Sequence, residues 1–126
     1  MSKKVMAVQG APAAVGPYNQ AVNACGLYFF SGQIPLDPKT GNLVAGDIKV
    51  QTKQVLENVK ALLQSVGKNF GDVVKSTVFL TDLTNFAGMN EVYQQYFTKD
   101  FPARSTIQVA GLPKGASVEI EVIVAG

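Results

Sequence analysis

One arginine and a pair of glutamates are the residues of this chain whose types and spacing are best suited to chemistry. Arg104 is the sole arginine of the sequence and follows Phe101-Pro102-Ala103. A guanidinium offers a planar fork of donors that matches a carboxylate or a phosphate, whereas lysine is a mobile point charge. Pro102 fixes its own backbone angle and biases Phe101 toward extended geometry, so the fork is mounted on stiff backbone. The segment predicts an anion site, although a lone arginine is also compatible with an ordinary surface ion pair.

The two glutamates alternate with apolar residues in a second segment, Val118-Glu119-Ile120-Glu121. Side chains alternate between the two faces of a strand, so we expect the valines and isoleucine to face a core and both glutamates to face away. In the preceding strand we expect Ile107 and Val109 to face that core. The residues that would then share the face of the glutamates are Arg104, Thr106 and Gln108.

That polar face has two interpretations. Periodicity alone is compatible with a solvated sheet face. However, the adjacent aromatic residues Phe29 and Phe30 point to opposite faces of a strand, so one of them must lie among the charges. A face that mixes aromatic and charged side chains is better explained by a partner subunit packing there, with polar clefts left between the subunits.

The residue inventory restricts the possible chemistry. The chain has 126 residues, which predicts a single domain over 1–126, and it contains no histidine and one cysteine. Ser-His and Cys-His pairs, histidine-ligated metals and cysteine-rich zinc sites are therefore excluded, and no metal site is predicted. The single Cys25 cannot form an intramolecular disulfide, which predicts a reducing compartment such as the cytoplasm.

Composition argues against a membrane or nucleic-acid role. Hydrophobic residues make up 47% of the chain and charged residues 16%. No apolar run approaches the ~18 residues of a membrane helix, and the N-terminal apolar run is too short for a signal peptide. The net charge of +2 comes from scattered lysines, which is weak support for RNA binding because that would favour a basic stripe.

Periodicity and turn chemistry predict six strands and two helices. The expected strands are 3–8, 19–24, 27–33, 72–81, 103–110 and 117–125, with a hairpin turn at Cys25-Gly26. The expected helices are 47–66, with Asp47 as N-cap and Gly67 after its end, and 85–97, with Thr84 as a candidate cap. This order predicts an α+β sandwich in which a mixed sheet carries both helices on one face.

Three motifs carry a family resemblance. They are Ser31-Gly32-Gln33-Ile34-Pro35, Pro102-Ala103-Arg104-Ser105 with Ile107, and Val118-Glu119-Ile120-Glu121. With Gly16-Pro17-Tyr18 they span nearly the whole chain. The sequence resembles the reactive-intermediate (imine) deaminase family, whose members are also called YjgF-like proteins, endoribonuclease L-PSP or translation inhibitor.

The resemblance implies a chorismate-mutase-like fold and a homotrimer with active sites in the clefts between subunits. It implies hydrolysis of 2-imino acids such as 2-iminobutanoate and 2-iminopropanoate, and of the enamines in exchange with them, to 2-oxo acids and ammonia. No metal or cofactor is expected. Carried over by motif, Arg104 would bind the substrate carboxylate and Glu119 would position or activate water. The residues expected to line or support the pocket are Tyr18, Ser31, Gly32, Asn90 and Thr106.

Ordinary structural roles remain open for several of these residues. Ser31 is also suited to bonding a backbone group, and Asn90 to a structural amide contact. Family members often carry cysteine where this chain has Thr106, so a backbone group or a pocket wall is expected there. Two other function classes also remain: a ribonuclease or translation inhibitor acting on RNA, and a non-enzymatic trimer that binds small carboxylates or acts like a chaperone. An enzyme needs Arg104 and Glu119 together, whereas a carboxylate sensor needs only Arg104.

Overall fold

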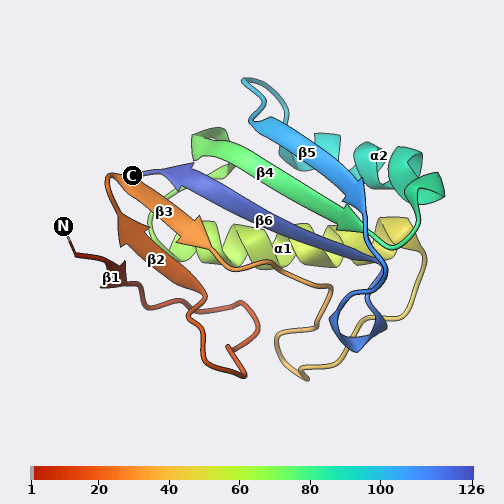
Figure 1. The fold of residues 1–126 in the computed structure, drawn as a ribbon, viewed down its shortest axis with the longest axis horizontal. Coiled ribbons are helices and arrows are strands. Elements are labelled where there is room, and N and C mark those ends of the chain that lie inside the picture. The colour runs from red at the N-terminus through yellow and green to blue at the C-terminus, as the bar shows by residue number, and fades with distance from the viewer. Residues whose placement is uncertain (1) are drawn as a thin grey trace.

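The computed structural model describes residues 2–126 and is built on one mixed sheet (Figure 1). Its strands lie in the spatial order β1-β2-β3-β6-β4-β5. Their bounds are β1 Lys4–Val5, β2 Ala21–Ala24, β3 Leu27–Phe30, β4 Val73–Leu80, β5 Ala103–Gln108 and β6 Val118–Ala125. The β4–β5 pair is parallel and the other described pairs are antiparallel. A parallel pair needs a crossover, which α2 (Phe86–Tyr96) supplies.

Capping chemistry sets the ends of the long helix α1 (Ile48–Ser65) as the sequence predicts. The Asp47 carboxylate accepts a 3.0 Å hydrogen bond from the backbone N–H of Val50. At the other end Gly67 has a φ of +72°, and the N–H of Lys68 returns to the carbonyl of Leu63 at 2.9 Å. This left-handed residue closes the last turn, a position for which glycine is preferred.

The cap predicted for α2 is wrong. Thr84 lies inside a short 3₁₀ turn, Leu83–Asn85, that precedes the helix. Asp82 caps this turn instead, because its carboxylate accepts from both the backbone N–H and the hydroxyl of Thr84, at 2.9 and 2.7 Å. The Asn85 side chain makes no capping bond at the start of α2.

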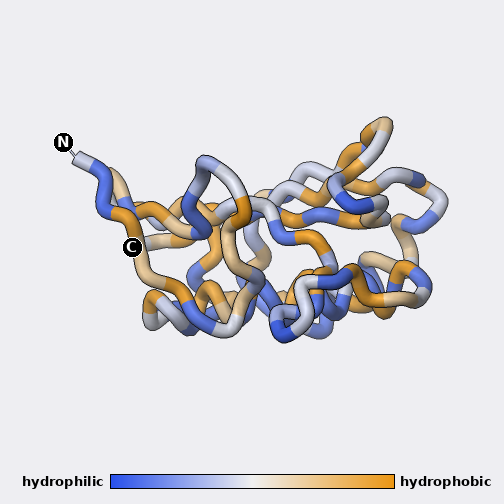
Figure 2. Tube along the Cα trace, turned by 90° about the horizontal axis from the view of Figure 1, so that it is seen from below, coloured by the Kyte–Doolittle hydropathy of each residue, from blue (hydrophilic) through white to orange (hydrophobic). Residues whose placement is uncertain are grey.

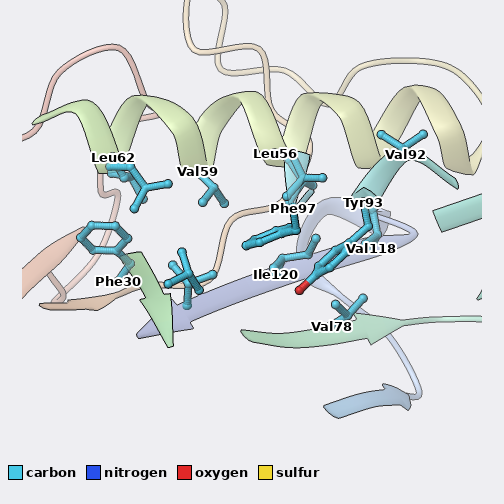
Figure 3. Packing of buried hydrophobic residues seen from close by; sticks show 14 of the residues in the cluster. Phe30, Leu56, Val59, Leu62, Val78, Val92, Tyr93, Phe97, Val118 and Ile120 are labelled. Carbon is cyan, nitrogen blue, oxygen red and sulfur yellow. The ribbon is translucent and has the colours of Figure 1, made fainter. Parts of the chain in front are cut away.

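The hydrophobic core lies between the sheet and the two helices (Figure 3). One face of α1 buries Val55, Leu56, Val59, Leu62 and Leu63. These side chains pack against the alternate residues of β6, namely Val118, Ile120, Val122 and Val124, which are all buried. The predicted α+β fold, with both helices on one face of a mixed sheet, is therefore confirmed.

The opposite face of the sheet carries no helix. Phe29 and Ile107 are 40% and 44% exposed on it, and Ile107, Phe79 and Glu119 lie side by side on β5, β4 and β6. We refer to this surface as the open face. The prediction that Ile107 faces the core is wrong, while one aromatic of the Phe29-Phe30 pair does lie among the charged residues, as expected.

Hydropathy alternates along the chain trace, as Figure 2 shows, which is the pattern of a layered fold with one face of each element buried. Among residues 2–126, no helix has both the length and the apolar character that crossing a membrane requires.

Candidate active site

Arg104 lies on the helix-covered face of β5, against α2. Its Nη1 donates a 2.7 Å hydrogen bond to Oδ1 of Asn90. The guanidinium carbon lies 4.7 Å from the centroid of the Tyr93 ring and 5.5 Å from that of Phe86. Both rings attract the cation through their π faces. Asn90, which the family resemblance placed in the pocket, therefore contacts the predicted anion-binding residue directly.

The arginine is charged and only partly buried, and it has no carboxylate partner within the described chain. Among residues 2–126 the ion pair that forms is Lys49 with Glu91, on the surface. A hollow of about 320 Å³ opens beside the guanidinium. The residues that line it are Asn90, Tyr93, Gln94, Phe101, Pro102 and Arg104. We call this hollow the arginine pocket, and its one fixed cation makes it suited to a small carboxylate.

Glu119 lies in a different hollow, which we call the glutamate pocket. This cavity has a volume of about 430 Å³, and its lining includes Tyr18, Gly32, Gln33 and Lys114 besides Glu119. Burial raises the pKa of the Glu119 carboxyl above its ordinary value, and the negative charge of Glu121 raises it further. A carboxylate with a raised pKa is a better proton acceptor, which suits a general base.

Gly32 determines where the Glu119 carboxylate lies. A Cβ atom added to Gly32 would come within 2.9 Å of Cδ of Glu119 and still closer to Oε2. The carboxylate therefore rests directly over the glycine, at a distance that no other residue type permits. This gives the Gly32 of the sequence motif a steric reason.

A chain of buried amides holds Gly32 against the Glu119 carboxylate. The backbone of Gln33 pairs with Ile120, the neighbour of Glu119, through hydrogen bonds of 2.8 and 3.1 Å. The Gln33 side chain donates to Oε1 of Gln20 at 2.9 Å, and Gln20 in turn donates to the carbonyl of Pro12. The loop before Tyr18, the Gly32 segment and β6 are thus held together. Sequence reasoning did not assign Gln20 or Gln33 a role; Gln33 lies inside the first motif, which was the available signal.

Ser31 and Thr106 occupy less direct positions. The Ser31 hydroxyl donates to the carbonyl of Asn19 at 2.6 Å, which matches the structural alternative for this residue. Thr106 follows Arg104 on the same face of β5, and its hydroxyl oxygen is buried without a hydrogen-bond partner among residues 2–126. Tyr18 lines the glutamate pocket with 46% of its surface exposed.

The two pockets do not meet within one chain. Arg104 pairs in register with Ser76 on β4, and Ser76 with Val122 of the core, so Arg104 faces the helices. Glu119 alternates with core residues on β6 and faces the open side. The prediction that Arg104, Thr106 and Gln108 share a face with the glutamates is wrong. That prediction assigned the two faces of the strand by taking Ile107 as a core residue, and Ile107 lies on the open face instead.

No cluster of metal ligands is present in the described chain. Residues 2–126 contain no group of three or more Cys, Asp or Glu side chains that could hold a metal ion. The charged groups that line the two pockets are the Arg104 guanidinium, the Glu119 carboxylate of raised pKa, and the ammonium groups of Lys39 and Lys114.

Comparison with known proteins identifies relatives that match nearly the whole chain. A family model described as Endoribonuclease L-PSP matches residues 8–126. A RutC family protein of Pyrococcus horikoshii is 52% identical over 121 residues, which is 96% of each chain. A 2-iminobutanoate/2-iminopropanoate deaminase of Salmonella typhimurium is 50% identical over 123 residues, covering 95% of each chain.

Solved structures agree with the fold. A Yersinia pestis protein of the Rid family superposes with a TM-score of 0.96 at 48% identity. The match covers 99% of this chain and all of the other. The mixed sheet with two helices on one face is thus shared with this structure.

Proposed function

Because the chain belongs to the endoribonuclease L-PSP family, which includes the Rid proteins, we propose that it hydrolyses 2-imino acids to 2-oxo acids and ammonia. The substrates we propose are 2-iminobutanoate and 2-iminopropanoate, which the name of the Salmonella typhimurium relative specifies for that protein. The observation that carries the proposal is the Arg104 guanidinium, which has no carboxylate partner among residues 2–126. It is oriented by Asn90 and opens onto a small pocket, so it offers a site for one small carboxylate.

We propose that the complete site forms between two copies of the chain in a homotrimer. The arginine pocket of one subunit would lie against the glutamate pocket of the next, since the two face different sides of one chain. The open face supports this assembly, because Phe29 and Ile107 are exposed on the same face of the sheet as Glu119. Exposed apolar surface of this kind is typical of an interface between subunits. Light scattering should give three times the 13.4 kDa of one chain.

In the proposed reaction, the Arg104 fork binds the substrate carboxylate and thereby fixes the neighbouring imine carbon. The oxygen of a water molecule attacks that carbon while the Glu119 carboxylate accepts a proton from the water. Glu119 then returns the proton to the nitrogen, which gives a carbinolamine. The carboxylate next takes the hydroxyl proton and passes it to the nitrogen, the carbon–nitrogen bond breaks, and ammonia leaves as the carbon–oxygen double bond forms. One water is consumed and no atom changes redox state, so the step needs no redox cofactor.

The single free thiol supports a reducing compartment, and we propose the cytoplasm. Cys25 is exposed and is the only cysteine of the chain. An exposed thiol persists where disulfide formation is suppressed.

Imine turnover tests the proposal directly. An amino-acid oxidase generates the imino acid, semicarbazide traps what is not hydrolysed, and the loss of trapped product measures activity. Arg104→Lys keeps the charge but loses the bidentate geometry, and Glu119→Gln keeps the shape but loses the proton acceptor. Each should lower kcat/KM by roughly 10²-fold or more while the assembly stays intact.

Glu121→Gln is the matched control, because Glu121 lies two residues further along the same strand and face. It should keep most of the activity. Normal turnover by folded Arg104→Lys would refute the carboxylate clamp. If the wild type instead cleaves RNA and leaves imines unchanged, the ribonuclease alternative would replace this proposal.

A further inference from the structure

Helix α2 presents three side chains to Arg104 at the spacing of one helical face. Phe86, Asn90 and Tyr93 lie at positions i, i+4 and i+7, which point in the same direction. All three contact the guanidinium, two through their rings and one through the 2.7 Å hydrogen bond. Asn90 was expected to support the pocket, whereas the sequence assigned no role in it to the two aromatic residues.

Two contacts fix the side chain of Tyr93, one at its hydroxyl and one at its ring. Its hydroxyl oxygen lies 2.7 Å from Oγ of Ser76, which is fully buried on β4. Its ring stacks on Phe97, with centroids 4.3 Å apart and planes 20° from parallel. Figure 3 shows the two rings side by side between the long helix α1 and the sheet. The position of the ring is thus determined from both layers of the fold.

Ser76, which anchors the Tyr93 hydroxyl, lies next to Arg104 in the sheet. Ser76 and Arg104 are register partners on the parallel strands β4 and β5. The Ser76 hydroxyl therefore holds the far end of Tyr93 beside the point where Arg104 leaves the sheet. The ring and the guanidinium are thus positioned from paired residues of neighbouring strands.

We propose that Tyr93, anchored by Ser76, is a positioning residue that sets the orientation of the Arg104 guanidinium for carboxylate binding. The ring determines where the guanidinium lies, and Asn90 determines which of its N–H groups point away from the pocket. The remaining donors are then directed at the ligand before it arrives. The catalytic part of this inference rests on the proposed function, while the binding part needs only a small carboxylate.

Burial raises the pKa of the Tyr93 hydroxyl, although Ser76 and the positive charge of Arg104 act in the opposite direction. The phenol is therefore neutral at ordinary pH. Removal of the Tyr93 hydroxyl should change the amplitude of a pH–rate profile and leave its apparent pKa values unchanged. This result would separate a positioning role from proton transfer.

The experiment uses Tyr93→Phe, Ser76→Ala, their double variant, and Tyr93→Leu. The matched control is Tyr96→Phe, because Tyr96 lies on the same helix but its hydroxyl donates to Glu57 at 2.7 Å, away from Arg104. Tyr93→Leu removes the ring and should lower kcat/KM about tenfold or more, the worth of a desolvated cation–π contact. Tyr93→Phe and Ser76→Ala should each lower kcat several-fold. Because they break one shared bond, the double variant should lose little more than either alone.

A spectroscopic measurement keeps the test independent of turnover. Arg104 is the only arginine, so its Nε–H group gives a single guanidinium resonance in a nitrogen–proton correlation spectrum. In the wild type this resonance should be displaced by the adjacent ring. Tyr93→Leu should move it toward the value of a free arginine, and Tyr96→Phe should leave it in place. The Tyr93→Phe variant keeps the ring, so it remains informative if Tyr93→Leu does not fold.

Binding of 2-oxobutanoate, measured by calorimetry, separates this inference from the proposed function. If the wild type shows no imine turnover yet binds 2-oxobutanoate with an affinity that falls in Tyr93→Leu, the positioning role stands and the function fails. If folded Tyr93→Leu keeps wild-type kinetics and an unmoved arginine resonance, the positioning role is overturned and the function stands. A lowered melting temperature with unchanged kcat in every variant would likewise reduce Tyr93 to a core residue.

Discussion

Gly32 lies directly beneath the Glu119 carboxylate, and Gly32→Ala tests whether the position of that carboxylate matters. The new Cβ would come within 2.9 Å of Cδ of Glu119 and closer to Oε2. Ordinary contact begins near 3.4 Å, so the carboxylate must retreat by on the order of 1 Å, a misplacement that can cost about 10²-fold in rate. Gly32 does not have the left-handed backbone that disfavours alanine, so the clash is the main effect.

The fold should tolerate this change, because the atoms displaced are the end of a flexible side chain. We therefore expect a trimer with a melting temperature close to that of the wild type and a kcat lowered about 10²-fold in the semicarbazide assay. Gly111→Ala is the matched control, since a Cβ there would meet nothing within 4 Å. It should keep full activity.

Combining the change with Glu119→Gln makes the test sharper. If Gly32→Ala acts only by moving the carboxylate, it should cost little further activity once the proton acceptor is gone, because the two effects are not additive. A wild-type kcat in folded Gly32→Ala would refute the reasoning. A further full 10²-fold loss in the Glu119→Gln background would refute it as well.

Three other predictions concern Glu119 and Thr106. The pKa of Glu119 is raised, so activity that needs its carboxylate should fall as the pH drops through a value above that of an ordinary glutamate, and a profile that stays flat through this range would contradict its role as base. The pKa of Glu119 is higher in the folded chain than in the unfolded chain, so the folded chain binds this proton more tightly. The free energy of unfolding should therefore fall as the pH rises from the unfolded-state pKa through the folded-state pKa. At pH values above the folded-state pKa, Glu119→Gln should raise the melting temperature. Thr106→Val replaces a buried hydroxyl that has no partner within residues 2–126; it should keep activity and leave stability unchanged or higher by up to about 1 kcal/mol in urea unfolding. Loss of activity in the folded Thr106→Val variant would assign the hydroxyl a role.

The elements of the fold were predictable because their signals are local. The Asp47 cap, the left-handed Gly67 and the positive φ angles of Cys25 and Gly26, at 55° and 75°, each depend on a few neighbouring residues. The Thr84 cap failed because two acceptable capping residues lie close together. Asp82 caps a short 3₁₀ turn before α2, and the Thr84 hydroxyl is used in that turn as a donor to the Asp82 carboxylate.

The faces of β5 were not predictable from periodicity. An apolar residue that faces a core and one that lies exposed on a sheet face give the same alternation, and Ile107 is of the second kind. Which face α2 covers depends on the crossover between β4 and β5, which no local pattern encodes. For the same reason, the sequence identified Arg104 through its segment and Asn90 through the family resemblance but did not connect Tyr93 or Ser76 with them.

The place of β6 in the sheet has a consequence for synthesis. This strand lies between β3 and β4, yet it is made after both of them. Until it leaves the ribosome, the hairpin of β2 and β3 and the unit of β4, α2 and β5 cannot join, and each exposes a strand edge. Pairings between residues so distant in sequence also slow folding. The nascent chain should therefore hold two unjoined halves and bind chaperones until β6 inserts between them.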